Sequence, residues 1–190
     1  MLKKLLHYVR GYVKTSVLTP IVVMAEVVLE VFIPLYMSRI IDVGIPNADL
    51  PYVLKTGGVM VLMALGALLF GALGARLAVY SSNGAAKNLR LALFDKIESF
   101  SFKNTDKFST ASLVTRLTND ITNVQQSFQM MIRLLARSPL MLILATVFAV
   151  RISPELSVII LLAIPILGGA MAFISKLAFP RFEAMLKKYD

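Results

Sequence analysis

The sequence has no cysteine and no tryptophan, and it has one histidine, His7. The lack of cysteine excludes a disulfide scaffold, a thiol nucleophile and a cysteine-based metal site. A single histidine leaves little for histidine chemistry, so we expect no catalytic residues and no metal site. Charge is also scarce, because charged residues make up 16% of the chain, against about 25% in ordinary soluble domains.

Apolar residues take the place of the missing charge. They make up 57% of the 190 residues, and the mean hydropathy is +0.75. A soluble fold of this size could not bury so much apolar surface, which excludes a water-soluble enzyme. A bilayer core about 30 Å thick is crossed by about 20 mostly apolar helical residues. The apolar runs predict four membrane spans, at 17–36, 57–80, 134–152 and 156–179.

The positive charges indicate how these spans are oriented. The net charge is +9, and the cations gather before the first span, between the second and third spans (81–133), and after the fourth. Because cytoplasmic segments are rich in lysine and arginine, both chain ends and the middle segment are predicted to be cytoplasmic. The positive net charge is thus explained by the orientation of the spans in the membrane, and no nucleic-acid partner is expected. The apolar face of residues 2–13 predicts a short helix in the cytoplasmic interface.

The middle segment predicts a long helical hairpin outside the bilayer. No proline occurs at 52–138 and no glycine at 85–167, so little interrupts a helix there. Apolar residues recur at helical spacing on both sides of a polar stretch at 101–112, which is predicted to be the turn. With these extensions, the predicted helices cover about 17–41, 57–100, 112–152 and 156–190.

Three stretches carry a resemblance to a known family. They are Ile40-Ile41-Asp42-Val43-Gly44-Ile45 after the first span, Asn88-Leu89-Arg90 with Leu93-Phe94 beyond the second, and FSTASLVTRLTND from Phe108 to Asp120. These residues resemble the transmembrane domain of multidrug-type ABC exporters, and most of all one subunit of bacterial heterodimeric exporters. The resemblance implies an all-α membrane fold with long cytoplasmic extensions, in which the chain supplies the first four of six helices.

The resemblance also implies partners. In that family a turn between the second and third helices contacts a nucleotide-binding domain, and residues 102–110 occupy its place. The implied contact residues are Phe102, Asn104, Asp106, Lys107 and Phe108. A second transmembrane subunit would complete a heterodimer in the cell membrane.

ATP and magnesium are implied only for the nucleotide-binding domain of such a transporter. No G-x-x-x-x-G-K-[ST] phosphate loop occurs in this sequence, so these residues are not expected to bind or hydrolyse ATP by the family's route. The chain is therefore interpreted as an N-terminal fragment of the membrane domain, without the nucleotide-binding domain. Within the predicted hairpin, the four-residue spacing of Arg116 and Asp120 predicts an ion pair.

Three ionisable residues inside the spans are candidates for function. Glu26 and Glu30 are four residues apart and share a helix face. They could face a central cavity that attracts cationic substrates or takes up a proton, because ionisable residues in a membrane span mark functional sites by default. Alternatively, a hydrogen bond to a neighbouring helix fixes packing. Arg137 could line the same cavity, or its side chain could reach the headgroups.

Two functions from different classes fit these observations. The first is part of the translocation pathway of an ATP-driven exporter, whose substrate would be an amphipathic drug or lipid-like compound. The second is a stand-alone membrane scaffold of four helices, whose hairpin docks a cytosolic protein without transport.

Overall fold

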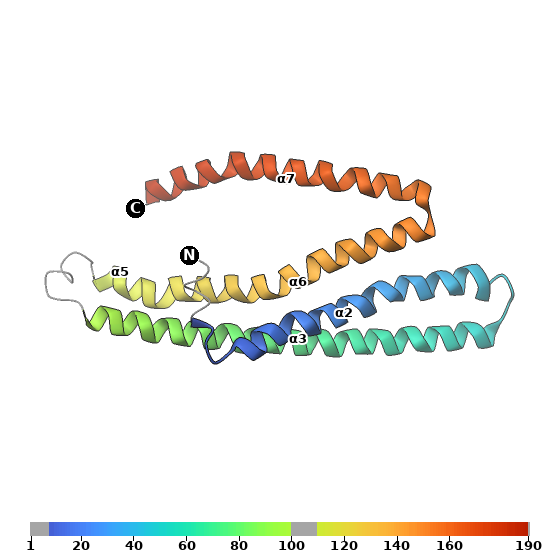
Figure 1. The fold of residues 1–190 in the computed structure, drawn as a ribbon, viewed down its shortest axis with the longest axis horizontal. Helices are drawn as coiled ribbons and strands as arrows, with labels where there is room; N and C mark the ends of the chain where they lie inside the picture. Colours follow the sequence, from blue (N-terminus) through green and yellow to red (C-terminus); the bar gives the residue numbers. More distant parts are fainter. Residues whose placement is uncertain (1–7, 100–109, 190) are drawn as a thin grey trace. The chain divides into compact units, whose positions relative to one another are not determined.

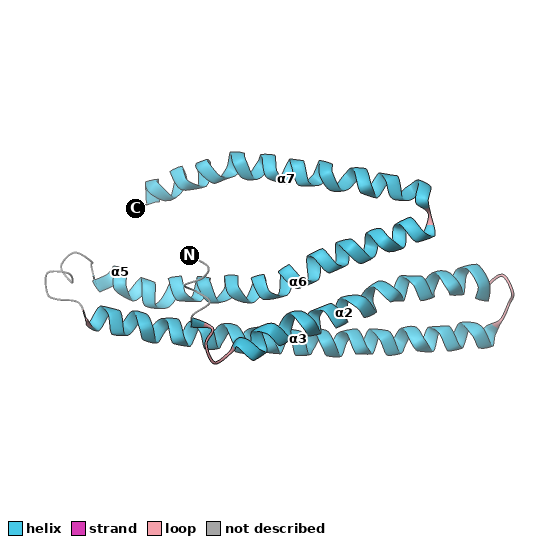
Figure 2. Cartoon of the chain, in the orientation of Figure 1, coloured by secondary structure: helices cyan, strands magenta, loops and turns pink. Residues whose placement is uncertain are grey.

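The fold is taken from a computed structural model that describes residues 8–99 and 110–189. These residues form helices joined by short loops and turns, and no strand occurs among them (Figure 2). The all-α fold expected from the sequence is therefore confirmed. The chain divides into two units, residues 1–141 and 142–190, and the first holds every interhelical contact discussed below.

Four helices of the described residues are long and apolar enough to cross a membrane. They are Val13–Gly44, Leu50–Glu98, Ser112–Ile152 and Ser157–Ala178. The first three predicted spans lie within these helices, and the fourth, 156–179, extends one residue beyond its helix at each end. The second helix is much longer than a membrane crossing requires, because it has 49 residues and about 20 are enough.

The first two long helices are α2 (Val13–Arg39) and α3 (Leu50–Glu98), which run antiparallel to each other (Figure 1). A π-helical turn, η1 (Ile40–Gly44), extends α2. The side chain of Asp49 caps α3 by accepting a hydrogen bond from the backbone N–H of Tyr52 at 3.0 Å. The helix thus begins at residue 50, earlier than the predicted 57.

Glycines on α3 allow α2 to approach closely. A Cβ atom added to Gly66 would lie 3.0 Å from Cδ1 of Leu29, and one added to Gly74 would lie 3.1 Å from Cγ2 of Val23. Val27 of α2 is 0% exposed in the same interface. In a membrane, such small residues permit the close backbone packing that holds helices together.

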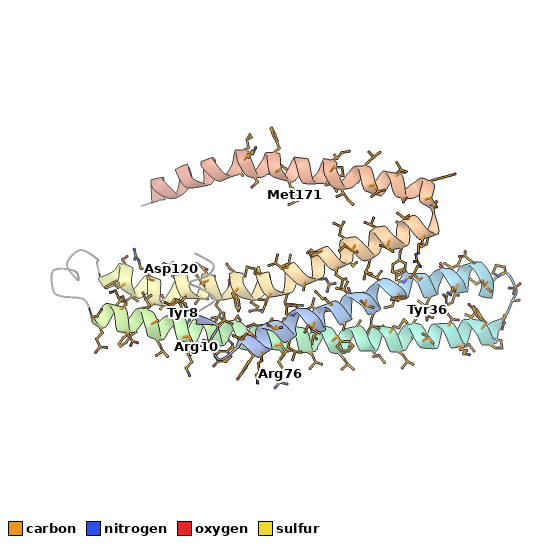
Figure 3. The ribbon with its side chains drawn as sticks, viewed as in Figure 1. Tyr8, Arg10, Tyr36, Arg76, Asp120 and Met171 are labelled. Carbon is orange, nitrogen blue, oxygen red and sulfur yellow. The ribbon has the colours of Figure 1, made fainter. Side chains whose placement is uncertain are left out.

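The N-terminal turn, residues 8–12, is fastened to α3. Gly11 has a φ of 92°, which a right-handed helix does not accommodate. The chain therefore turns at residues 9–11, whereas the predicted interfacial helix ran to residue 13; residues 2–7 of that prediction lie outside the described residues. The amide of Asn88 donates to the carbonyls of Tyr8 (2.8 Å) and Arg10 (3.1 Å), and both residues lie beside α3 in Figure 3.

The third long helix consists of α5 (Thr110–Thr115), the π-helical turn η2 (Arg116–Asp120) and α6 (Ile121–Ile152). Its N-terminal part lies along the C-terminal half of α3 (Figure 1), where Gln125 donates to Asn83 at 2.6 Å. Ile121 is 3% exposed. A mostly apolar cavity of about 280 Å³ separates the two helices near Leu89 and Phe128.

The prolines are unevenly distributed among these helices. Pro20 and Pro34 lie inside α2, and Pro139 lies inside α6. The proline of α3 is Pro51, in its first turn, where the missing N–H would have no intrahelical partner. In the second unit, α7 (Pro154–Tyr189) begins at a proline in the same way, and the hydroxyl of Ser157 donates to the carbonyl of Pro154 at 2.6 Å.

Candidate functional site

The predicted ionisable residues of α2 and α6 form one hydrogen-bonded network. The guanidinium of Arg137 donates through Nη1 to Oε1 of Glu26 at 2.9 Å and through Nη2 to Oε2 of Glu30 at 2.8 Å. Both contacts are ion pairs. The planar fork of an arginine suits this arrangement, because its two nitrogens reach two acceptors at once.

The three side chains differ in burial. That of Glu26 is 10% exposed, that of Glu30 is 34% exposed, and that of Arg137 is 41% exposed. Oε2 of Glu26 is buried and has no hydrogen-bond partner among the described residues. Two carboxylates and one guanidinium leave one negative charge in excess when all three are ionised, and the apolar surroundings of the helices make that charge costly.

Gly71 on α3 provides the space that Glu26 occupies. A Cβ atom at this position would lie 3.0 Å from Oε1 of Glu26 and 3.2 Å from its Cδ. Any larger residue would press on the carboxylate that Arg137 binds. The network therefore involves three helices. The charges come from α2 and α6, and α3 supplies the notch, which is the space left by the missing side chain of Gly71.

The structure thus brings together all three residues of the predicted cavity, but it shows them paired. The alternative stated for the glutamates, a hydrogen bond to a neighbouring helix, agrees with these contacts. That Arg137 is the partner could not be predicted, because it depends on which faces of two distant helices meet. The spacing of Glu26 and Glu30 was informative, since residues four apart lie on one helix face, where both side chains can reach the same partner. Gly71 had a weaker signal, as one of several glycines in a predicted span.

Other predicted site residues remain predictions. Phe102, Asn104, Asp106, Lys107 and Phe108 lie outside the described residues. Arg116 and Asp120 are the first and last residues of the π-helical turn η2, and their ion pair stays a prediction. Among the residues that the structure describes, no cluster of His, Asp or Glu could hold a metal ion.

These features define an all-helical, multi-pass membrane protein with a charged network inside its spans. Comparison with known proteins gives the family. Residues 17–190 match the family model for the ABC transporter transmembrane region, so the chain belongs to the ABC transporter family as its membrane region.

Several bacterial relatives cover the whole chain. The uncharacterized ABC transporter ATP-binding protein YfiB of Bacillus subtilis (strain 168) is 31% identical over 189 residues, which is 100% of this chain and 33% of that protein. The uncharacterized ABC transporter ATP-binding protein Rv1273c of Mycobacterium tuberculosis (strain H37Rv) is 27% identical over 197 residues, again 100% of this chain and 33% of the relative.

A mammalian relative matches a shorter part of the chain. The ABC-type oligopeptide transporter ABCB9 of Mus musculus is 28% identical over 168 residues, covering 87% of this chain and 22% of that protein. The chain spans about a third of the length of the bacterial relatives that it matches. The comparisons therefore identify its membrane region as transport-related.

Proposed function

We propose that the chain forms part of the translocation pathway of an ATP-driven exporter. The observation that carries this proposal is the length of α3, whose 49 residues extend about 73 Å at 1.5 Å per residue. A bilayer core is about 30 Å thick, so the helix reaches well outside the membrane. The helix from Thr110 to Ile152 accompanies it there.

The proposed orientation places both ends and the 81–133 segment in the cytoplasm. It is supported by the lysine and arginine content of these segments. The loop between α2 and α3, with the π-helical turn η1, would then face the opposite side. Motion at the cytoplasmic end of the hairpin would be carried into the membrane by α3 and α6.

The proposed partners are a nucleotide-binding domain and a second transmembrane subunit, in a heterodimer. The names of the bacterial relatives, which describe whole ATP-binding proteins, support a nucleotide-binding domain. ATP and magnesium would bind there, and residues 102–108 would contact it. ATP binding would move this turn and thereby change the side on which the pathway is open.

The coupling proposal is tested by crosslinking in the complete transporter. A cysteine at Asp106, introduced into a chain that has none, should crosslink to a cysteine on the nucleotide-binding domain, with a yield that depends on nucleotide. A cysteine at Ile45, in the loop on the other side, is the matched control and should give no adduct. Absence of an adduct at Asp106 under every nucleotide condition would favour the scaffold function.

The charged network is proposed to border the substrate pathway. Its partly exposed members, Glu30 and Arg137, would be accessible to an amphipathic drug or lipid-like compound. Neutralising Glu26 with Glu26→Gln should reduce export of cationic compounds more than export of neutral ones, because it removes the excess negative charge. Arg137→Gln removes a positive charge, so it should reduce export of neutral compounds more than export of cationic ones. Equal effects on both compound types would contradict the proposed cavity.

A further inference from the structure

The charges on α2 and α6 occur in two pairs with the same spacing. Glu26 and Glu30 are four residues apart on α2, and Arg133 and Arg137 are four residues apart on α6. Residues at this spacing lie one turn apart on one helix face. Each helix is antiparallel to the adjoining part of α3 (Figure 1), so α2 and α6 run in the same direction. The two pairs are therefore parallel rows.

Only one of the two arginines is used in the observed arrangement. Arg137 holds both glutamates, at 2.9 and 2.8 Å. Arg133 is half-buried, and within residues 8–99 and 110–189 no ion pair or hydrogen bond engages it. The four charges sum to zero, but the three that make contact sum to −1. Oε2 of Glu26 is an acceptor that lacks a donor among the described residues.

We infer that Arg133 is the second half of this site and that α6 moves along α2 by one turn, so that Arg133 takes the place of Arg137 between the glutamates. The displacement would be about 5.4 Å, the pitch of an α-helix. One-turn shifts of a helix past its neighbour are an established type of conformational transition.

The equal spacing makes such a movement possible inside a membrane. Before and after it, one arginine bridges both glutamates and the other has no acidic partner. Halfway along, each arginine would face one glutamate. No carboxylate is left without a guanidinium at any stage, which avoids the large cost of an unpaired buried charge.

The inference rests on the proposed function for its direction and energy source. In the proposed orientation Arg133 is nearer the cytoplasm than Arg137, so its charge reaches water more easily. The observed register is then the lower in energy, because it leaves the better-hydrated arginine unpaired. The shifted register places Arg137 deeper and without a partner, and ATP binding would supply the energy for it.

The test measures the register directly in the complete transporter in lipid nanodiscs. Spin labels on cysteines at Met37 of α2 and Met130 of α6, which are 47% and 61% exposed, report the axial position of α6. In the wild type, trapping with ATP and vanadate should shorten the label distance by up to about 5 Å, because one helical turn is 5.4 Å. An unchanged distance would overturn the inference.

Two variants then separate the roles of the arginines. The Arg133→Gln protein should show the resting label distance in both nucleotide conditions and should lose most of its transport activity. Its thermal stability should be unchanged, because Arg133 has no partner among the described residues in the resting arrangement. Arg137→Gln should show the short distance without nucleotide, because Arg133 is drawn to the glutamates. If Arg137→Gln does not fold, Arg133→Gln alone decides.

Arg76→Gln, which removes an exposed arginine of α3, is the matched control and should retain both distances and transport. An Arg133→Gln protein that moves and transports like the wild type would overturn the inference. A wild type that shows both distances but exports no compound would support the two registers and overturn the exporter proposal.

Discussion

At the scale of single residues, Gly71 determines how closely the Glu26 carboxylate can approach α3. We expect Gly71→Ala to destabilise the protein by up to about 2 kcal/mol, because overpacking typically costs about 1–3 kcal/mol and the better helix propensity of alanine offsets about 0.5–1 kcal/mol of it. The added Cβ would lie 3.0 Å from Oε1 of Glu26, so the carboxylate must shift and its bond to Arg137 must lengthen. A lower melting temperature of the purified protein would show this.

Gly58 provides the control on the same helix. A Cβ added there would meet no atom within 4 Å, and alanine is the better helix former by about 0.5–1 kcal/mol. Gly58→Ala should therefore leave the melting temperature unchanged or raise it. If both substitutions have the same effect, the notch at Gly71 is not needed for the network.

The residues of the network could be identified from the sequence, but their arrangement could not. Glu26, Glu30 and Arg137 could be identified because ionisable groups inside an apolar run are costly. Their pairing depends on the rotation and height of α2 relative to α6, which local spacing does not determine. Gly71 was one glycine among several until its neighbour was known.

At the scale of an element, the attachment of the N-terminal turn to α3 depends on Asn88. We expect Asn88→Ala to free residues 8–12, because it removes two hydrogen bonds, to the carbonyls of Tyr8 and Arg10. Each is worth about 0.5–1.5 kcal/mol. Hydrogen exchange of the turn amides should become faster, while exchange in the middle of α3 should stay the same.

Asn119→Ala is a suitable comparison, because Asn119 is exposed on the η2 turn and is remote from residues 8–12 in the sequence. It should leave exchange of the N-terminal turn unaltered. Asn88→Asp adds a second check, since aspartate is similar in size but its carboxylate cannot donate to the two carbonyls. Normal exchange in the Asn88→Asp protein would show that packing, rather than hydrogen bonding, holds the turn.

The helices themselves were predictable, and their ends were less so. The apolar runs predicted each long helix, and the lack of proline at 52–138 and of glycine at 85–167 predicted the helical hairpin. The start of α3 was missed because its first turn is less apolar, although the Asp49 cap and Pro51 mark it. The end of the predicted N-terminal helix was missed because Gly11 adopts a positive φ, which the periodicity of apolar residues does not reveal.

At the scale of the whole molecule, the proposed orientation gives a direct labelling experiment. A cysteine at Ile45, which is 63% exposed, should react with a membrane-impermeant thiol reagent in intact cells. A cysteine at Ser99, exposed at the end of α3, should react only after the membrane is opened. Labelling of the Ser99 position in intact cells would contradict the cytoplasmic assignment.

The architecture of the membrane region was largely accessible from composition and from family-like motifs. Four apolar helices and the family membership were expected and are confirmed. The contacts between α2, α3 and α6 were not accessible, because they depend on small residues and single charges that leave little trace in hydropathy.

The uneven placement of proline has a mechanical consequence. Pro34 removes the hydrogen bond that would reach the carbonyl of Glu30, and Pro139 lies two residues after Arg137. Both helices thus lack a backbone hydrogen bond close to the charges that join them, whereas no proline interrupts α3 from its second turn to Glu98. A force applied at the Glu98 end of α3 would be transmitted along this helix, and α2 and α6 would bend near Glu30 and Arg137.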